Sequence, residues 1–137
     1  MIDFRQIEFS GDDFWSDHEA QVVSQQIARF TVSEWRTLGY ELTSQASLVQ
    51  ERVSQLLGEF NVESAARILL LLAASEDREV ALTAREALRG MSPPVVITSA
   101  KRLVFDGQLV AERLIEYKSI NQILDEIEVK PFRQGAA

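Results

Sequence analysis

Apolar residues recur in this 137-residue chain after a shift of about 31 positions, and this repeat limits the fold more than any other feature. Within each copy the apolar positions are three or four residues apart, which is the spacing of one face of an α-helix. The sets that coincide are Trp35, Ala66 and Ile97; Leu38, Leu69 and Ala100; Leu42, Ala73 and Val104; Val49, Val80 and Ala111; and Val53, Ala84 and Ile115. Because one helix pair cannot bury its own apolar face, about three pairs are expected to stack as a solenoid. An ordinary helical bundle with helices of similar length is the alternative.

Local signals also favour helices over strands. Asp12 or Asp13, and later Ser33, are candidate N-cap residues. Gly90 suits the end of a helix, and the proline pair that follows it suits the start of the next one. The β-branched segment 94–100, PVVITSA, has the composition of a strand, but it leads without a break into a helical pattern. The chain is therefore predicted to be all-α.

The length of the chain fits one domain with a sizeable core, so residues 1–137 are predicted to form a single helical-repeat domain. Apolar residues alternate in part near the start, and this predicts a short strand or an extended arm over residues 1–12. The last segment, residues 130–137, is predicted to be a flexible tail.

The clearest helix pair covers residues 64–91, SAARILLLLAASEDREVALTAREALRGM. Its leucine-rich first helix, short acidic turn and second helix that begins near EV and ends in ALR resemble a HEAT repeat. Residues 49–61, VQERVSQLLGEFN, resemble the second helix of the preceding unit, whereas Tyr117 and Lys118 depart from the pattern in the unit that follows. The matching positions are Glu79, Val80, Ala84, Ala87 and Leu88. We therefore expect an all-α, HEAT-like α-solenoid of about three helix pairs with a short N-terminal extended segment.

Composition and charge exclude several classes of function. The chain has 21 acidic residues against 14 lysines and arginines, which gives a net charge of −7. Binding to nucleic acid is not expected, because phosphates are bound by lysine and arginine that replace counterions. The absence of cysteine excludes disulfides and thiolate zinc sites. The start does not resemble a signal peptide and the longest apolar run, residues 68–74, is too short to span a bilayer, so we expect a cytoplasmic protein without membrane contact.

The stretch SGDDFWSDHEAQ, residues 10–21, places the only histidine, His18, among four carboxylates and two aromatic residues. A histidine without a second imidazole or a Glu-x-x-His pair is a poor zinc or iron site, and the carboxylates do not follow a magnesium-binding pattern. General acid–base catalysis by His18 lacks a partner nucleophile or a glycine-rich motif. We therefore expect no enzymatic activity, metal, cofactor or small-molecule substrate.

We interpret this stretch as part of an acidic surface that binds a protein partner. Carboxylates on a rigid scaffold attract a lysine- and arginine-rich surface, and an aromatic side chain often anchors an interface. If Phe14 points into the core, Trp15 and the acids are free to lie near the surface. Solvated charges on helix faces are the ordinary alternative. The candidate partner-binding residues are Asp12, Asp13, Trp15, Asp17 and Glu19, with Glu76, Asp77 and Glu79 as a second group.

The pattern DDFWSDHEAQ, the helix around SEWRTL and the HEAT-like pair are together similar to small bacterial immunity proteins of polymorphic toxin systems, including contact-dependent growth inhibition. The likeness lies in size, charge, architecture and this local pattern. It implies a cytoplasmic protein that binds one cognate toxin domain, commonly a basic nuclease, and occludes its active site or substrate channel without any reaction. A HEAT-like adaptor or scaffold that binds a peptide or a protein subunit is the alternative. A lyase-like or regulatory HEAT protein of a pigment-bearing system is a third interpretation, which no cofactor-specific residue supports.

Overall fold

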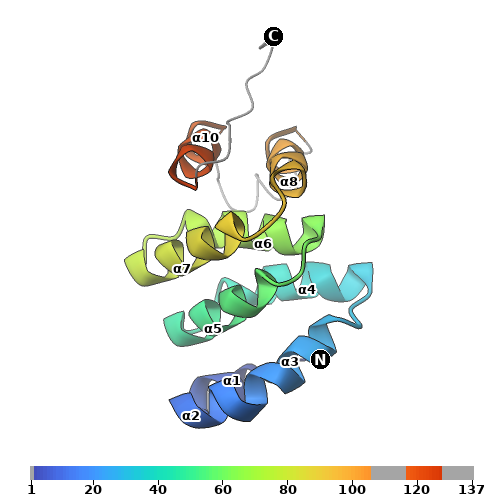
Figure 1. Cartoon of the computed structure of the whole chain (residues 1–137), viewed down its shortest axis with the longest axis vertical. Helices are drawn as coiled ribbons and strands as arrows, with labels where there is room; N and C mark the ends of the chain where they lie inside the picture. Colours follow the sequence, from blue (N-terminus) through green and yellow to red (C-terminus); the bar gives the residue numbers. More distant parts are fainter. Residues whose placement is uncertain (1, 106–116, 128–137) are drawn as a thin grey trace.

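The computed structural model describes residues 2–105 and 117–127, and every regular element in these two ranges is a helix (Figure 1). The all-α prediction is confirmed for these residues, including the β-branched segment 94–100, which lies within a helix. The tail predicted for residues 130–137 lies outside the described ranges. The elements are α1 (Phe4–Phe9), α2 (Asp12–Phe14), η1 (Trp15–Glu19), α3 (Ala20–Ile27), α4 (Val32–Leu42), α5 (Ser47–Leu57), α6 (Glu63–Ala73), α7 (Arg78–Arg89), α8 (Pro93–Phe105) and α10 (Tyr117–Glu126).

The N-terminal segment contains a helix, so the strand or extended arm predicted over residues 1–12 is wrong. The side chain of Asp3 caps α1 by accepting hydrogen bonds from the backbone N–H groups of Arg5 and Gln6, at 3.1 and 3.2 Å. Ile7, in the same helix, is fully buried. The partial alternation of apolar residues also fits a short amphipathic helix, and the cap favours the helix.

Side-chain caps define the start of two later helices. Before α4, the hydroxyl of Thr31 accepts a hydrogen bond from the N–H of Glu34, whose carboxylate accepts one from the N–H of Thr31. The N-cap is therefore Thr31 and not the predicted Ser33. Asp77 caps α7 by accepting hydrogen bonds from two backbone N–H groups of its first turn. Both helices begin where a short polar side chain satisfies N–H groups that have no partner within the helix.

The longer helices are stacked in layers, and the two helices of one layer are called a pair (Figure 1). α6 packs against its partner α7, and each also contacts a helix of the preceding pair, because α6 lies against α4 and α7 lies against α5. α8 packs on α6, while α1 and α3 contact α5. α4 and α6 begin at Val32 and Glu63, and α5 and α7 begin at Ser47 and Arg78. Both offsets equal the predicted shift of about 31 residues.

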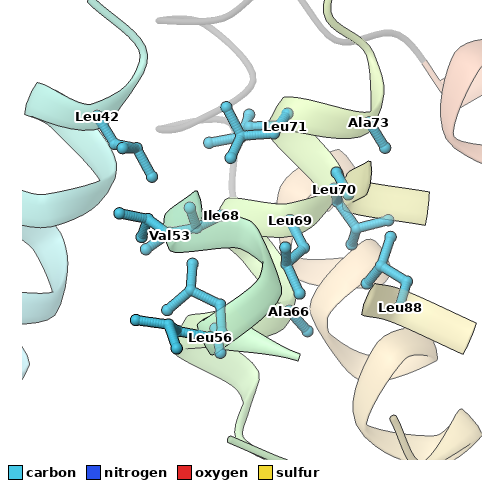
Figure 2. Packing of buried hydrophobic residues seen from close by; sticks show 14 of the residues in the cluster. Leu42, Val53, Leu56, Ala66, Ile68, Leu69, Leu70, Leu71, Ala73 and Leu88 are labelled. Atoms are coloured by element: carbon cyan, nitrogen blue, oxygen red, sulfur yellow. The ribbon is translucent and has the colours of Figure 1, made fainter. Parts of the chain in front are cut away.

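α6 lies at the centre of the core and buries side chains in all directions. In Figure 2, Leu42 of α4 and Val53 of α5 lie on one side of α6 and Leu88 of α7 lies on the other. From Ile68 to Ala73 every side chain of α6 is buried, so this part of the helix has no polar face, which explains most of the apolar run at residues 68–74. Among the described residues, no helix is long and apolar enough to cross a bilayer. Fully buried positions that coincide under the shift are Leu38, Leu69 and Ala100; Leu42 and Ala73; Val49 and Val80; and Val53 and Ala84.

The contact between α5 and α7 predicts the effect of a methyl group at Gly58, the residue that follows α5. Such a methyl carbon would lie 2.9 Å from the Cβ and 3.2 Å from the Cα of Ala87. We predict that Gly58→Ala lowers the free energy of unfolding by about 1–3 kcal/mol, because the two helices must separate to admit the methyl group. Urea unfolding measures this change.

Gly90→Ala is the matched control, because Gly90 also follows a helix and its added methyl group would meet only a carbonyl oxygen of Ala87, at 3.6 Å. We expect this variant to stay within about 0.5 kcal/mol of the unmodified protein. Equal losses in the two variants would contradict the proposed cause, the close approach of α5 and α7.

Candidate partner-binding surface

Three elements bring most of the predicted acidic residues to one edge of the stack. α2 and the first turns of α5 and α7 lie on the same side of the molecule (Figure 1). Arg52 of α5 lies 2.8 Å from Asp12 of α2, and Ser47 at the start of α5 donates a hydrogen bond to Asp77, the N-cap of α7. We call this region the acidic edge. We define it by the carboxylates with contacts there, Asp12, Glu51, Asp77 and Glu79, and by their exposed neighbours in the sequence, Asp13, Asp17 and Glu76.

The helix that carries the first acidic group contains a π-helical segment, η1, from Trp15 to Glu19. Trp15 is only 6% exposed and belongs to the core, whereas Phe14 is 47% exposed. The ring of Phe14 lies 5.3 Å from that of His18, measured between centroids. This is the reverse of the arrangement in which Phe14 is buried and Trp15 lies near the surface. The indole of Trp15 is therefore not available as a surface anchor, and Phe14 is an exposed aromatic side chain beside the acidic edge.

A buried arginine holds the N-terminal helices on α5. Arg52 is 4% exposed and donates hydrogen bonds to the carbonyl oxygens of Ile7 and Ser10, at 2.7 and 2.8 Å. It donates a further one to the carboxylate of Asp12, at 2.8 Å. Its guanidinium also lies 5.3 Å from the ring centre of Trp15, which is within the range of a cation–π interaction. The planar fork of arginine allows one side chain to satisfy several partners at once.

Arg52 lies within the helix predicted over residues 49–61, but its role was not predicted. The signal was present, because Arg52 lies on the same helix face as Val49, Val53 and Leu56, which are apolar. A cation on an apolar helix face is buried only where it finds hydrogen-bond partners. Such a position therefore predicts a partner segment elsewhere in the chain, although it does not identify that segment.

The second part of the acidic edge is organised by Asp77. Its carboxylate accepts hydrogen bonds from the N–H groups of Glu79 and Val80 and from the hydroxyl of Ser47. The bond from Ser47, followed by that from Val80, lowers the pKa of Asp77, because each donor favours the ionised form. Partial burial, followed by the charges of Asp77 and Glu79, raises the pKa of Glu51. A cation placed beside Glu51 would relieve this repulsion.

For the four remaining predicted residues, the structure shows how exposed each side chain is. Asp13, Asp17 and Glu76 are exposed on the acidic edge, and Glu19 is half-buried at the end of η1. Within the described part of the chain, no group of three or more histidine, aspartate or glutamate residues is arranged to hold a metal ion. No protein family, curated protein or solved structure matches the chain. The geometry and charge of the acidic edge are therefore the only basis for a proposal about its role.

The contacts of Arg52 predict a large effect on stability. We expect Arg52→Met to lower the free energy of unfolding by about 2–4 kcal/mol, because the carbonyl groups of Ile7 and Ser10 lose their donors. Arg52→Lys should recover only part of the loss, since an ammonium group cannot reproduce the fork. Urea unfolding of both variants measures the difference.

Asp12→Asn is the control for this prediction, because it removes the ion pair and leaves the two carbonyl groups bonded. The side chain of Asp12 is 97% exposed, so we expect a change of less than about 1 kcal/mol. A loss as large as that of Arg52→Met would show that the ion pair, and not the backbone contacts, holds the segment.

The lowered pKa of Asp77 predicts a pH dependence of stability. The folded state favours the carboxylate, so its contribution is fully present above the ordinary pKa of 3.8 and is lost as the pH falls through the lower folded-state pKa. The melting temperature of Asp77→Asn should therefore fall less steeply below pH 3.8 than that of the unmodified protein. Ser47→Ala should reduce the same slope, because it removes the largest cause of the shift. Melting curves followed by circular dichroism test this, and parallel pH profiles for the three proteins would contradict it.

Proposed function

We propose that this protein is a cytoplasmic bacterial immunity protein that binds and neutralises a cognate toxin domain, with a basic nuclease as the expected target. The observation that carries the proposal is the acidic edge, where carboxylates from several helices lie on one side of a packed stack in a chain of net charge −7. Arg52 and Asp77 hold the segments that bear these charges. A basic surface would be attracted at long range and then held by charge-assisted hydrogen bonds.

The mechanism we propose is occlusion. A nuclease holds phosphate groups, so its active site or substrate channel exposes lysine and arginine. Carboxylates such as Asp13 and Asp17 would occupy the positions of the phosphates, neutralise the basic residues and exclude the nucleic acid. The exposed ring of Phe14 takes the place of Trp15 as the aromatic contact in this proposal, since Trp15 lies in the core. No bond is made or broken.

We also propose that the stack is HEAT-like. Two offsets of about 31 residues between helix starts support this, as does the burial of the residues that coincide under the shift. The order of contacts adds support, because α4, α6 and α8 follow one another on one side of the stack and α5 and α7 follow on the other. A solenoid in which each layer packs on the next presents an extended surface to a partner.

The direct test is recovery of the partner from the native host. Cross-linking in cells, purification of the tagged chain and mass spectrometry should identify a basic nuclease domain, and the purified protein should inhibit that nuclease at stoichiometric amounts. The association rate should fall as the salt concentration rises, because the attraction acts between exposed charges. A stable partner that is a metabolic or structural subunit without toxin activity would instead support the HEAT-like adaptor.

Charge reversal on the acidic edge provides a sharper prediction. We expect Asp13→Lys/Asp17→Lys to reduce the association rate with the nuclease by about tenfold or more at low salt. The melting temperature should fall only slightly, since both residues are exposed and only Asp13 lies in the first turn of a helix. Stopped-flow or surface plasmon resonance measurements provide the rate. The control is Glu59→Lys/Asp125→Lys, which changes the net charge equally at exposed residues away from this segment. An equal effect of the two pairs would show that total charge, and not the acidic edge, governs binding.

A further inference from the structure

A pocket of about 710 Å³ lies across α7, between α5 and α10. Gln55 of α5 and Glu126 of α10 line its sides, and Leu82 and Ala87 of α7 contribute apolar surface. Leu82 is 45% exposed, although leucine is among the residues that folding most often buries. The volume is within the range of sites that enclose a ligand or a large side chain.

The charged groups around the pocket neutralise one another. Arg85 pairs with Glu126, and Arg89 pairs with Glu86. Arg89 also donates a hydrogen bond to the backbone carbonyl oxygen of Glu126, at 2.8 Å, so that α10 is held against α7. Because two cations face two anions, the pocket favours neither sign of charge, and its apolar surface decides what binds there.

The pocket and part of the acidic edge share one face of two neighbouring helices. On α5, Glu51 and Gln55 are four residues apart, and on α7, Glu79, Thr83 and Glu86 are four and three residues apart. Each set therefore lies on one side of its helix. The influence of Glu79 on the pKa of Glu51 is consistent with the two sets being neighbours. A negative region thus continues directly into a pocket of balanced charge.

We infer that this face of α5 and α7 docks a segment of a protein partner in which lysine or arginine side chains flank one large apolar side chain. The cations contact Glu51 and Glu79, and the apolar side chain enters the pocket against Leu82. The inference rests on the proposed function in one respect, that the partner is basic. The charge of the face agrees with this, because Glu51, Glu76, Asp77 and Glu79 near the starts of α5 and α7 are accompanied by one exposed arginine, Arg78, while Arg52 is buried.

The pocket provides selectivity between basic partners, which the charges alone do not provide. A row of carboxylates attracts any basic protein, and discrimination between basic proteins requires a contact that only one of them can make. An apolar side chain that fits beside Leu82 is such a contact, and anchors of this kind dominate the binding energy of many interfaces.

The first test uses a defined peptide with the whole chain. An isotope-labelled sample is titrated with a synthetic peptide that has one phenylalanine between two pairs of lysines, and the backbone NMR signals are followed. We expect shifts at Glu51, Gln55, Leu82 and Thr83. Replacement of the phenylalanine by alanine should abolish the shifts at Leu82 and Thr83 and retain those near Glu51, while replacement of the lysines by glutamates should abolish all of them. No shifts with the original peptide, or shifts confined to other surfaces, would overturn the inference.

A second test separates this inference from the proposed function. Leu82→Ser removes the apolar surface of the pocket, and Val32→Ser makes a comparable change at a residue of α4 that is 75% exposed. With a basic toxin as the partner, Leu82→Ser should weaken binding about tenfold and Val32→Ser should not. Matching melting curves exclude unfolding as the cause.

The two proposals fail in different ways in this test. Unchanged toxin binding by Leu82→Ser refutes the docking face and leaves the immunity function intact. Binding of the lysine–phenylalanine peptide at the pocket, in a protein whose native partner is not a toxin, supports the docking face and refutes the immunity function.

Discussion

One helix, α6, is buried on nearly every side, and the arrangement of the other helices follows from the need to cover it. Such a helix has no face that water can solvate, so it must be surrounded. α4, α5, α7, α8 and α10 all contact it. α6 is thus enclosed by helices that precede it and helices that follow it in the chain. The starts of the helices at the edge of the stack remain available for polar and charged residues.

The N-terminal layer is attached to this stack by a cation as well as by apolar packing. A buried guanidinium destabilises a fold unless its donors find acceptors, so Arg52 is tolerated only when α1, α2 and η1 are all in place around it. The carboxylates that follow Asp12 are positioned by the same contacts. The packing of the N-terminal layer and the geometry of the part of the acidic edge that this layer carries therefore depend on one side chain.

Local patterns predicted the parts of the structure that local forces determine. The spacing of apolar residues located α4 to α7, because helical periodicity and caps act over a few residues. The burial of Trp15 in place of Phe14 was not predictable, since it accompanies a π-helical segment that the apolar pattern does not reveal. The role of Arg52 depends on partners 40 to 45 residues away in the sequence. That the partner is basic stays a prediction. It is based on the charge of the chain, and the fold does not test it.

Some carboxylates of the acidic edge are stabilised by the starts of helices, whereas the charged form of Glu51 is disfavoured. Asp12 and Asp13 lie in the first turn of α2, where the helix dipole favours acids, and Asp77 caps α7 by accepting hydrogen bonds from its free N–H groups. Partial burial, followed by the nearby charges of Asp77 and Glu79, raises the pKa of Glu51, so a cation that approaches stabilises its carboxylate. In the proposed complex, long-range attraction determines how fast the basic partner associates, and short-range apolar contact beside Leu82 determines how slowly it dissociates. A surface that offered only charge would bind many basic proteins briefly, whereas charge that adjoins a neutral pocket selects one of them.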